Sequence, residues 1–475
     1  MGSVTSARPG EKDRATARVA TSSTFRIAGV YYTPSVRRAT RAGAFAIDVA
    51  PRLRYCPNWT VSGHGKGPMG HGDTPDGPIA RYMELPSPED RVAGGLARWT
   101  DAGSPFENGM QAVVVFEAGQ TAWSVTIDGP QMGFRLGRTP RADTVVRADI
   151  ATLVGLAEGT VAGAYAFLQG RLVIRGNMAL ALRLDGTGQP DRPAHFPRAR
   201  TVRAHDVGTF YLEAGQGPAV VLLHGLGATC ASMLPTLAEL ARDHRVLAVD
   251  LPGFGDSGKP VQAYDPAFYA RWLTAFLDVV GVERAVLVGN SMGGRIAIEA
   301  GLRAPERVDR VVLFAPSLAF KRFREATPLV RFLMAEIAAM PIVMPRALVM
   351  AALRMMFARP ERLPAAWYDA AADEFARVFA TARGRMAFFS AARQIYLEEA
   401  HGEEGFWDRL PALSRPSLFL WGDSDQLVPC RFAPHVTHAL PDAHSVVIPD
   451  CGHVPQFEHP ATTHRLVRAF LGRPG

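Results

Sequence analysis

The sequence predicts an α/β protein in which a parallel sheet is preceded by a smaller α+β domain. From residue 201 onward, continuous apolar runs of strand length alternate with helical patterns. This order is typical of parallel strands that are buried on both faces and joined by crossover helices. Between residues 88 and 187, by contrast, short strands follow one another in a meander with helical segments at its ends. The 475 residues are also too many for one hydrophobic core, so more than one domain is expected.

The first 87 residues are predicted to be a basic arm followed by a Gly/Pro-rich linker. Residues 1–60 hold ten Lys or Arg and three Asp or Glu residues, which accounts for the whole formal net charge of +7. A solvated, disordered leader is the interpretation we favour. The alternative is peripheral contact with an anionic membrane, whereas a nucleic-acid partner is not expected. Residues 61–78 are rich in Gly and Pro, as in a linker, and the sequence assigns no function to residues 1–85.

The sequence contains no signal for secretion, for membrane insertion or for metal binding. The basic N-terminus lacks an apolar signal-peptide core, and no apolar run has the roughly 20 residues of a membrane span, so a cytoplasmic location is expected. The four cysteines, Cys56, Cys230, Cys430 and Cys451, have neither metal-site nor disulfide-framework spacing. We therefore expect an activity that needs no metal and no cofactor.

Residues 88–187 are predicted to fold as one small α+β domain. A helix is expected at 88–99 because Pro88 suits a first turn, and Asp149 caps a second helix at 149–156. A third helix is expected at 161–169. Alternating apolar residues and Gly-containing turns predict the strands, which are 111–117, 121–128, 131–136, 143–147, 171–175 and 178–184. A polar Pro/Gly-rich linker, 188–200, ends this domain.

The segment 164–184, AYAFLQGRLVIRGNMALALRL, resembles the C-terminal signature of the sterol carrier protein 2 family. The resemblance covers roughly residues 90–187. It implies a hydrophobic tunnel that holds fatty acyl chains, acyl-CoA or sterols, formed by apolar side chains that cannot be assigned individually. The alternative is a structural or dimerising appendage, so a dimer is one expected oligomeric state.

The domain 201–475 places several polar loops at one edge of its sheet. The strands are expected at 219–223, 245–249, 286–288, 311–314, 416–421 and 444–448, after two strand-like runs within 201–213. Helices are expected at 232–242, 266–280 and 295–302. Because the carboxyl ends of parallel strands meet at one edge, the loops that follow these strands should lie together. They include the His224-Gly225-Leu226-Gly227 loop and the loop containing Asp256 and Ser257, which we interpret as loop-structuring residues.

Ser291 is the candidate nucleophile. It stands in Gly289-Asn290-Ser291-Met292-Gly293, a G-x-S-x-G pattern between an apolar strand and a helix. Such a sharp turn strains the serine and exposes its side chain, and a Cβ at the flanking positions would strike neighbouring backbone. The simpler alternative is a glycine-rich turn of an ordinary α/β protein.

His453 and Asp425 supply the base and the acid that a serine nucleophile requires. They follow Ser291 in the chain order serine, aspartate, histidine. Asp425 is chosen from the pattern W-G-x-x-D-x-x-V-P, with Asp423 as the fallback. The oxyanion donors are predicted to be the backbone N–H groups of Met292 and Leu226.

These motifs resemble the α/β-hydrolase fold family, and most closely its meta-cleavage-product hydrolases. The resemblance implies an α/β-hydrolase fold with a helical cap, here 316–412, over Ser291. Those carbon–carbon hydrolases commonly carry an aromatic residue after the histidine, whereas this chain has Val454. Ser291 also speaks against the aspartate nucleophile of haloalkane dehalogenases and epoxide hydrolases.

The sequence therefore predicts a serine esterase that cleaves a carboxylic ester or thioester of a hydrophobic acyl substrate. Its alternatives are a carbon–carbon hydrolase and a lipid carrier with incidental hydrolysis. The methionines of the cap either line the substrate site or fill the core of the cap. Arg295, just after the nucleophile, is expected to form a structural ion pair rather than to act in the site.

Overall fold

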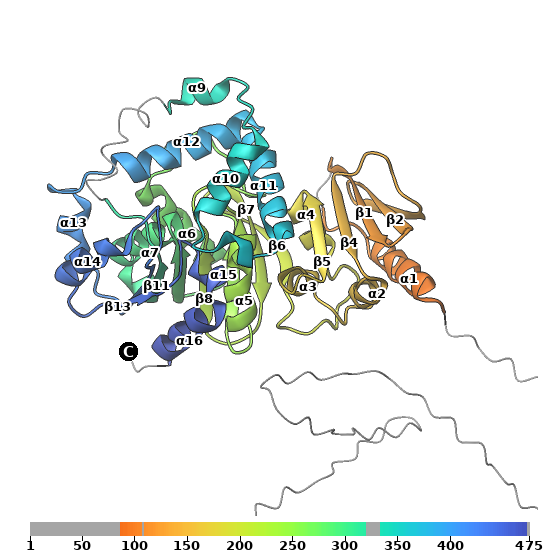
Figure 1. Ribbon diagram of the computed structural model, residues 1–475, viewed down its shortest axis with the longest axis horizontal. Coiled ribbons are helices and arrows are strands. Elements are labelled where there is room, and N and C mark those ends of the chain that lie inside the picture. Colours follow the sequence, from red (N-terminus) through yellow and green to blue (C-terminus); the bar gives the residue numbers. More distant parts are fainter. Residues whose placement is uncertain (1–85, 107–108, 320–332, 473–475) are drawn as a thin grey trace, which may run out of the picture. The chain divides into compact units, whose positions relative to one another are not determined.

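Two β-sheets organise the part of the chain that the structure, a computed structural model, describes: residues 86–106, 109–319 and 333–472 (Figure 1). These residues belong to one compact unit. The proposed basic arm and Gly/Pro linker lie outside the described residues, except for their last two positions. Among the helices described, none is long and apolar enough to cross a membrane.

The first sheet lies in the N-terminal module, which we define as residues 88–184. Its strand order is β3-β2-β1-β4-β5, with β4 parallel to β1 and the other neighbours antiparallel. The strands are β1 Gln111–Ala118, β2 Thr121–Asp128, β3 Gln131–Leu136, β4 Thr144–Ala148 and β5 Leu172–Gly176. The helices are α1 Pro88–Asp101, α2 Ile150–Glu158, α3 Gly163–Leu168 and α4 Met178–Leu184.

Local capping explains where two of these helices begin. Ser87 and Asp90 form a reciprocal capping box at α1, which also has Pro88 in its first turn. Asp149 caps α2, because its Oδ1 accepts a hydrogen bond of 2.8 Å from the Thr152 N–H. The Asp149 cap confirms the prediction made from the sequence.

The prediction of a strand at 178–184 is wrong, because these residues form helix α4. Asn177 caps the helix through a hydrogen bond of 3.0 Å from the Ala179 N–H to its Oδ1. Ala, Leu, Met and Arg are strong helix formers, so the local propensity agrees with the observed helix. Met178, Ala179 and Leu180 are all buried, so the alternation of large and small residues did not mark an exposed and a buried face.

The second sheet lies in the C-terminal module, which we define as residues 198–472. Its order is β13-β12-β11-β10-β8-β9-β7-β6, and it is parallel from β13 to β9, as predicted. The last two strands, β7 and β6, are antiparallel. The strands are β6 Arg198–Ala204, β7 Val207–Ala214, β8 Ala219–Leu223, β9 Arg245–Val249, β10 Ala285–Asn290, β11 Val308–Phe314, β12 Ser417–Gly422 and β13 His444–Ile448.

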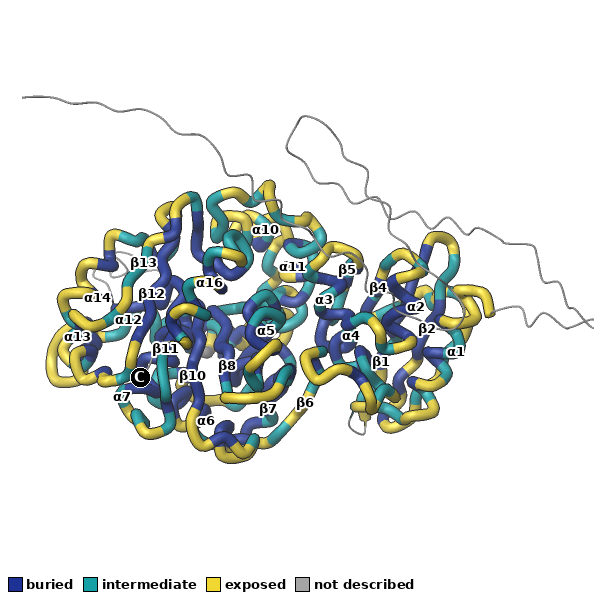
Figure 2. The backbone as a smooth tube through the Cα atoms, turned by 90° about the horizontal axis from the view of Figure 1, so that it is seen from below, coloured by how far each residue is buried: buried dark blue, intermediate teal, exposed yellow. Residues whose placement is uncertain are grey.

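Helices cover both faces of this sheet. Alternate strand residues face one core that includes α5 and α16 and another that includes α6 and α7, so the central strands are buried on both sides. Strands β10 and β12 are buried at every residue (Figure 2). The helices around the sheet are α5 Leu234–Leu240, α6 Pro266–Val279, α7 Met292–Arg303, α13 Phe406–Arg409, α14 Ala433–Ala439, α15 Pro455–Glu458 and α16 Pro460–Leu471.

A group of helices that we call the cap is inserted between β11 and β12. It consists of α9 Ala335–Ala339, α10 Arg346–Met355, α11 Ala365–Phe379 and α12 Ala382–Leu397, which lie together at the top of Figure 1. Short 3₁₀ turns complete the described chain: η1 Cys230–Met233, η2 Pro305–Arg307, η4 Pro360–Arg362, η5 Leu410–Ala412 and η6 Cys430–Phe432.

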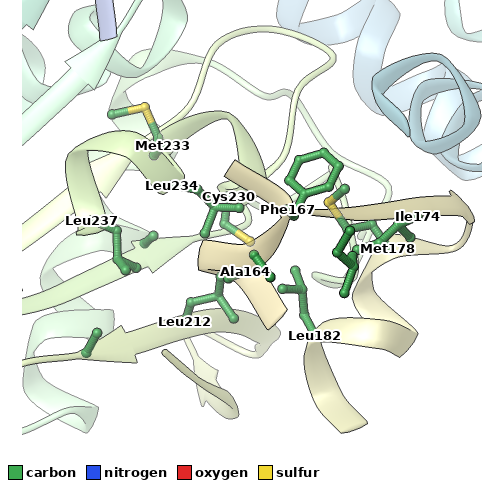
Figure 3. Close-up of a cluster of buried hydrophobic side chains, with 14 of the residues drawn as sticks. Ala164, Phe167, Ile174, Met178, Leu182, Leu212, Cys230, Met233, Leu234 and Leu237 are labelled. Carbon is green, nitrogen blue, oxygen red and sulfur yellow. The ribbon is translucent and has the colours of Figure 1, made fainter. Parts of the chain in front are cut away.

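The two modules share one hydrophobic core. Side chains of α3, β5 and α4, including Phe167, Met178 and Leu182, belong to the same buried cluster as Leu212 of β7 and Leu234 of α5 (Figure 3). Burial of apolar surface is the dominant favourable term in folding. The modules are therefore held together by apolar contact and do not form two separate cores.

Candidate active site

The turn between β10 and α7 presents Ser291 in a strained conformation. The backbone of Ser291 has φ of 53° and ψ of −115°, a conformation that residues other than glycine rarely adopt. A Cβ on Gly289 would lie 2.3 Å from the Gly293 carbonyl oxygen, and a Cβ on Gly293 would lie 2.1 Å from that of Leu223. Both distances are shorter than any real contact, so the backbone demands glycine on each side of the serine.

Hydrogen bonds fix this turn to the ends of neighbouring strands. The Ser291 N–H donates to Phe314 O over 2.9 Å, and the Ser317 N–H donates to Ser291 O over 3.0 Å. The Asn290 side-chain amide donates to both Phe314 O and His453 O at 3.0 Å. Asn290 therefore connects the serine turn directly to the loop that carries His453.

Ser317 is a site residue that the sequence analysis missed. Its Oγ lies 3.3 Å from Ser291 Oγ and is the hydrogen-bond partner of that hydroxyl among the described residues. A single serine in a cap connection carries no motif. The sequence could have indicated Ser317 only by its position, which is three residues after the end of β11 and at the same sheet edge as Ser291.

His453 and Asp425 form a buried pair. His453 Nδ1 lies 2.8 Å from Asp425 Oδ2, and each residue is 4% exposed. The other oxygen of Asp425 accepts from the N–H groups of Leu427 and Val428 at 2.8 and 2.9 Å. These two backbone bonds orient the carboxylate, which in turn orients the imidazole.

The fallback residue Asp423 has a different place. Its Oδ1 accepts from Ser424 Oγ at 2.8 Å and from the Cys451 N–H at 3.3 Å, and its side chain is exposed. Although desolvation raises it, the pKa of Asp423 is lowered overall by hydrogen bonds from Ser424 and from backbone N–H groups. Asp423 thus shapes the loop before His453, while Asp425 contacts the imidazole itself.

The loop after β8 brings Leu226 next to the serine turn. A Cβ on Gly225 would lie 3.4 Å from Ser291 Cβ, which measures how closely the two segments approach. His224 holds the loop: its Nδ1 bonds to Gly225 O at 2.7 Å, and its Nε2 accepts from the Leu251 N–H at 3.0 Å. Burial lowers the pKa of His224 to about 4, so it is neutral at pH 7. The Leu226 and Met292 N–H groups have no protein acceptor among the described residues.

Ser291, His453 and Leu226 line one cavity of about 450 Å³. The cap contributes most of its apolar wall, through Leu348, Val349, Ala352, Leu353, Met356, Trp367, Ala371, Phe375, Phe388 and Ile395. Among the described residues, the lining contains no Lys or Arg, and Glu374 is its one carboxylate. A long apolar group fits such a wall, whereas a carboxylate-bearing substrate would find no fixed cation there.

The methionines of the cap divide between the two roles considered from the sequence. Met344 and Met356 line the cavity. Met344 and Met386 also pack against the small core of the cap, around Phe379 and Phe389.

Arg295 forms a structural ion pair, as expected. It is 2% exposed and lies 2.8 Å from Glu299, which is 1% exposed, with Glu398 as its other partner. Although burial disfavours ionisation of Glu299, the charge of Arg295 and hydrogen bonds from other arginines hold its pKa at about 2. Arg295 is absent from the cavity lining.

Asp256 and Ser257 organise their loop and its neighbours. The Ser257 hydroxyl donates to Asp250 O at 2.6 Å and accepts from the Phe210 N–H at 2.9 Å. Asp256 forms ion pairs with Arg183 at 3.3 Å and with Arg377 at 3.0 Å. Asp256 therefore connects three segments, which is a wider role than the loop-structuring one predicted.

Known proteins resemble this chain in both modules. Residues 218–460 match the alpha/beta hydrolase fold family, and residues 107–187 match the SCP-2 sterol transfer family. An uncharacterised protein of Mycobacterium tuberculosis strain H37Rv is 29% identical over 307 residues, which cover 60% of this chain and 84% of that protein.

Two further similarities are to hydrolases. The 2-hydroxymuconate semialdehyde hydrolase of Pseudomonas sp. strain CF600 is 29% identical over 284 residues, covering 59% of this chain and 96% of the relative. The crystal structure of a membrane phospholipase A, described as a bacterial virulence factor, has a TM-score of 0.51 and 26% identity, covering 68% of this chain and 96% of that one.

The family match covers just over half of the chain and includes strands β8 to β13, the serine turn and the His453 loop. It agrees with the parallel sheet and its inserted cap, while the SCP-2 match covers most of the N-terminal module and ends three residues beyond it. The chain belongs to the alpha/beta hydrolase fold family and carries an SCP-2-like domain on the N-terminal side of its hydrolase domain.

Proposed function

We propose that this protein is a serine hydrolase that cleaves a carboxylic ester or thioester of a hydrophobic acyl substrate. The observation that carries the proposal is the convergence on one apolar cavity of Ser291, on its strained turn, and the buried His453–Asp425 pair. A nucleophile, a base and an orienting acid are the components of two-step acyl transfer.

The geometry supports the following roles. His453 Nε2 takes the Ser291 proton as Ser291 Oγ attacks the acyl carbonyl carbon, and the Leu226 and Met292 N–H groups stabilise the oxyanion. His453 then returns the proton to the departing alcohol or thiol, which leaves an acyl group on Ser291. Water, deprotonated by His453, then attacks the acyl carbonyl carbon. The bond from this carbon to Ser291 Oγ breaks, His453 returns the proton to Ser291 Oγ, and the acid is released. Throughout, Asp425 holds the proton on Nδ1 and stabilises the imidazolium.

The cavity lining supports a neutral, apolar acyl group. Its wall is formed mainly by aliphatic and aromatic side chains, and its described part has no cationic side chain. The similarity to a membrane phospholipase A and the SCP-2-like domain both support a lipid-like substrate.

The second candidate function is hydrolysis of a carbon–carbon bond. It is favoured by the 29% identity to 2-hydroxymuconate semialdehyde hydrolase. Against it stand Val454 after the histidine and the absence of Lys or Arg from the described cavity lining, since related dienoate substrates carry a carboxylate.

Pre-steady-state hydrolysis of p-nitrophenyl esters tests the proposal. We expect a burst of p-nitrophenol from the wild-type protein and its loss in Ser291→Ala, with a fall in kcat of about 10⁴-fold or more. A 2-hydroxy-6-oxo-dienoate substrate and an acyl-CoA thioester are measured beside the ester. Faster turnover of the dienoate favours the second candidate. Full ester hydrolysis by Ser291→Ala contradicts the proposal and leaves a lipid carrier with incidental activity.

A further inference from the structure

We propose that the N-terminal module forms part of the substrate-binding wall of the hydrolase. In this proposal Phe167 and Met178 contact the acyl chain of a substrate bound at Ser291, and they help to set the chain length that the enzyme accepts. The inference rests on the proposed serine hydrolase function. It adds a substrate-contacting role for the sterol-carrier-like domain within the catalytic cavity itself.

Two side chains of the N-terminal module reach the catalytic cavity. Phe167, near the end of α3, and Met178, the first residue of α4, line the same cavity as Ser291 and His453. Their exposed fractions are 4% and 5%, so both face the interior and not solvent. An acyl chain that fills this cavity would therefore contact residues of both modules.

The shared core fixes these two side chains in place. Phe167 and Met178 belong to the same buried cluster as Cys230 and Leu234 of the C-terminal module, and all four are buried (Figure 3). The Asn177 cap sets the start of α4 and so the position of Met178. Protein interiors pack densely, so a side chain held this way offers a ligand a rigid surface.

Hydrogen bonds and a ring contact connect helix α11 of the cap to the N-terminal module near Phe167. The Trp367 indole N–H donates to Phe167 O over 3.1 Å, and the two rings lie 6.3 Å apart. Asp373 accepts from Arg175 Nε at 2.7 Å and from the Gly176 N–H at 3.1 Å. Trp367 also lines the cavity, so the same contacts position a cap residue and a module residue in the wall.

A second set of polar contacts begins at Met178. The Met178 N–H donates to Glu374 over 3.4 Å, and Glu374 pairs with Arg377 on α11. Arg377 reaches Asp256, which in turn pairs with Arg183 of α4 at 3.3 Å. The cap, the loop after β9 and α4 thus form one connected ionic network at the side of the cavity.

The geometry argues against a module that only shuttles lipid or only dimerises. Either role leaves the catalytic cavity complete without the module, yet its side chains form part of the cavity wall. Removing residues 88–184 would also expose the shared apolar core. Point variants in the full chain therefore test the proposal better than a truncation.

The test is a chain-length series on the full-length protein, with p-nitrophenyl acetate, butyrate, octanoate and dodecanoate. Phe167→Trp narrows the cavity and should shift the preferred chain shorter, with a loss in kcat/KM of about fourfold for each methylene that loses its contact. Phe167→Ala and Met178→Ala should shift the preference in the opposite direction. Phe134→Ala and Met132→Ala, which change the same residue types away from the cavity, should leave the profile unchanged.

A binding measurement separates this proposal from the proposed function. In the Ser291→Ala background, the Kd of the fluorescent neutral long-chain ester methyl cis-parinarate should rise at least threefold on Phe167→Ala or Met178→Ala, because the bound chain loses its contacts with that side chain. This readout needs no turnover, so it holds even if wild-type protein fails to hydrolyse esters. Phe167→Leu, which preserves more of the core, keeps the test open if the alanine variant is unstable. Folded variants at both positions with unchanged chain-length profile and unchanged Kd overturn the proposal.

Discussion

Replacing Asp425 with asparagine gives a sharp prediction, because both carboxylate oxygens have defined partners. Oδ1 accepts from the Leu427 and Val428 N–H groups, and Oδ2 bonds to His453 Nδ1. An asparagine side chain keeps these two backbone bonds only with its oxygen in the Oδ1 position. Its NH₂ group then faces His453 Nδ1, which must become an acceptor.

The substitution thus moves the imidazole proton to Nε2, the nitrogen that must accept the Ser291 proton. The same change of tautomer in the Ser-His-Asp triad lowers kcat by about 10⁴-fold. For this protein we therefore expect a loss of about 10⁴-fold, or ~5 kcal/mol of transition-state stabilisation, with little change in stability.

Steady-state and burst kinetics on p-nitrophenyl butyrate measure the effect, and thermal unfolding checks that the variant is folded. The matched control is Asp423→Asn, two residues away, whose hydrogen bonds are to Ser424 and Cys451. Its kcat should fall less than tenfold. The reasoning is refuted if folded Asp425→Asn retains more than a tenth of wild-type kcat, or if Asp423→Asn loses as much.

Two further predictions concern stability. Gly293→Ala would place a Cβ 2.1 Å from Leu223 O, so we expect the free energy of unfolding, measured in urea, to fall by about 3 kcal/mol or more. Gly208→Ala is the control, since a Cβ there would meet nothing within 4 Å; its loss should be less than about 0.5 kcal/mol, and equal losses would contradict the prediction. Burial beside Thr236 lowers the pKa of His464 from 6.5 to about 4, so the unfolded chain binds its proton first as the pH falls. The contribution of neutral His464 to the free energy of unfolding is therefore complete above about pH 6.5, and about 3 kcal/mol of it is lost on acidification to pH 4. His464→Gln should remove this pH dependence of stability, and an unchanged pH slope in the variant would disprove the assignment.

The parts of the fold predicted most accurately are those with strong local signals. The bounds of β9 and β13 coincide with the predicted strands 245–249 and 444–448. The run at 219–223 is an uninterrupted apolar stretch that ends at a glycine-containing loop, and it forms β8 with the predicted bounds. Helix α4 was missed, because burial on several sides of a short Ala- and Leu-rich helix produces an alternation that also suits a strand.

The site could be anticipated only where a residue belongs to a motif. Ser291 and His453 stand in recognisable turns, whereas Ser317 is a single serine without any. The approach of Phe167 to Trp367 joins positions 200 residues apart. Such contacts depend on how two modules pack, and no pattern within either segment specifies them.

The central claim is that Ser291 is the nucleophile, and covalent trapping tests it most directly. The full-length protein is incubated with a fluorophosphonate, digested, and analysed by mass spectrometry, with Ser291→Ala and Ser317→Ala treated in parallel. We predict one phosphonylated peptide containing Ser291, present in the wild-type protein and in Ser317→Ala and absent from Ser291→Ala. Labelling on a different residue, or undiminished labelling of Ser291→Ala, would contradict the account.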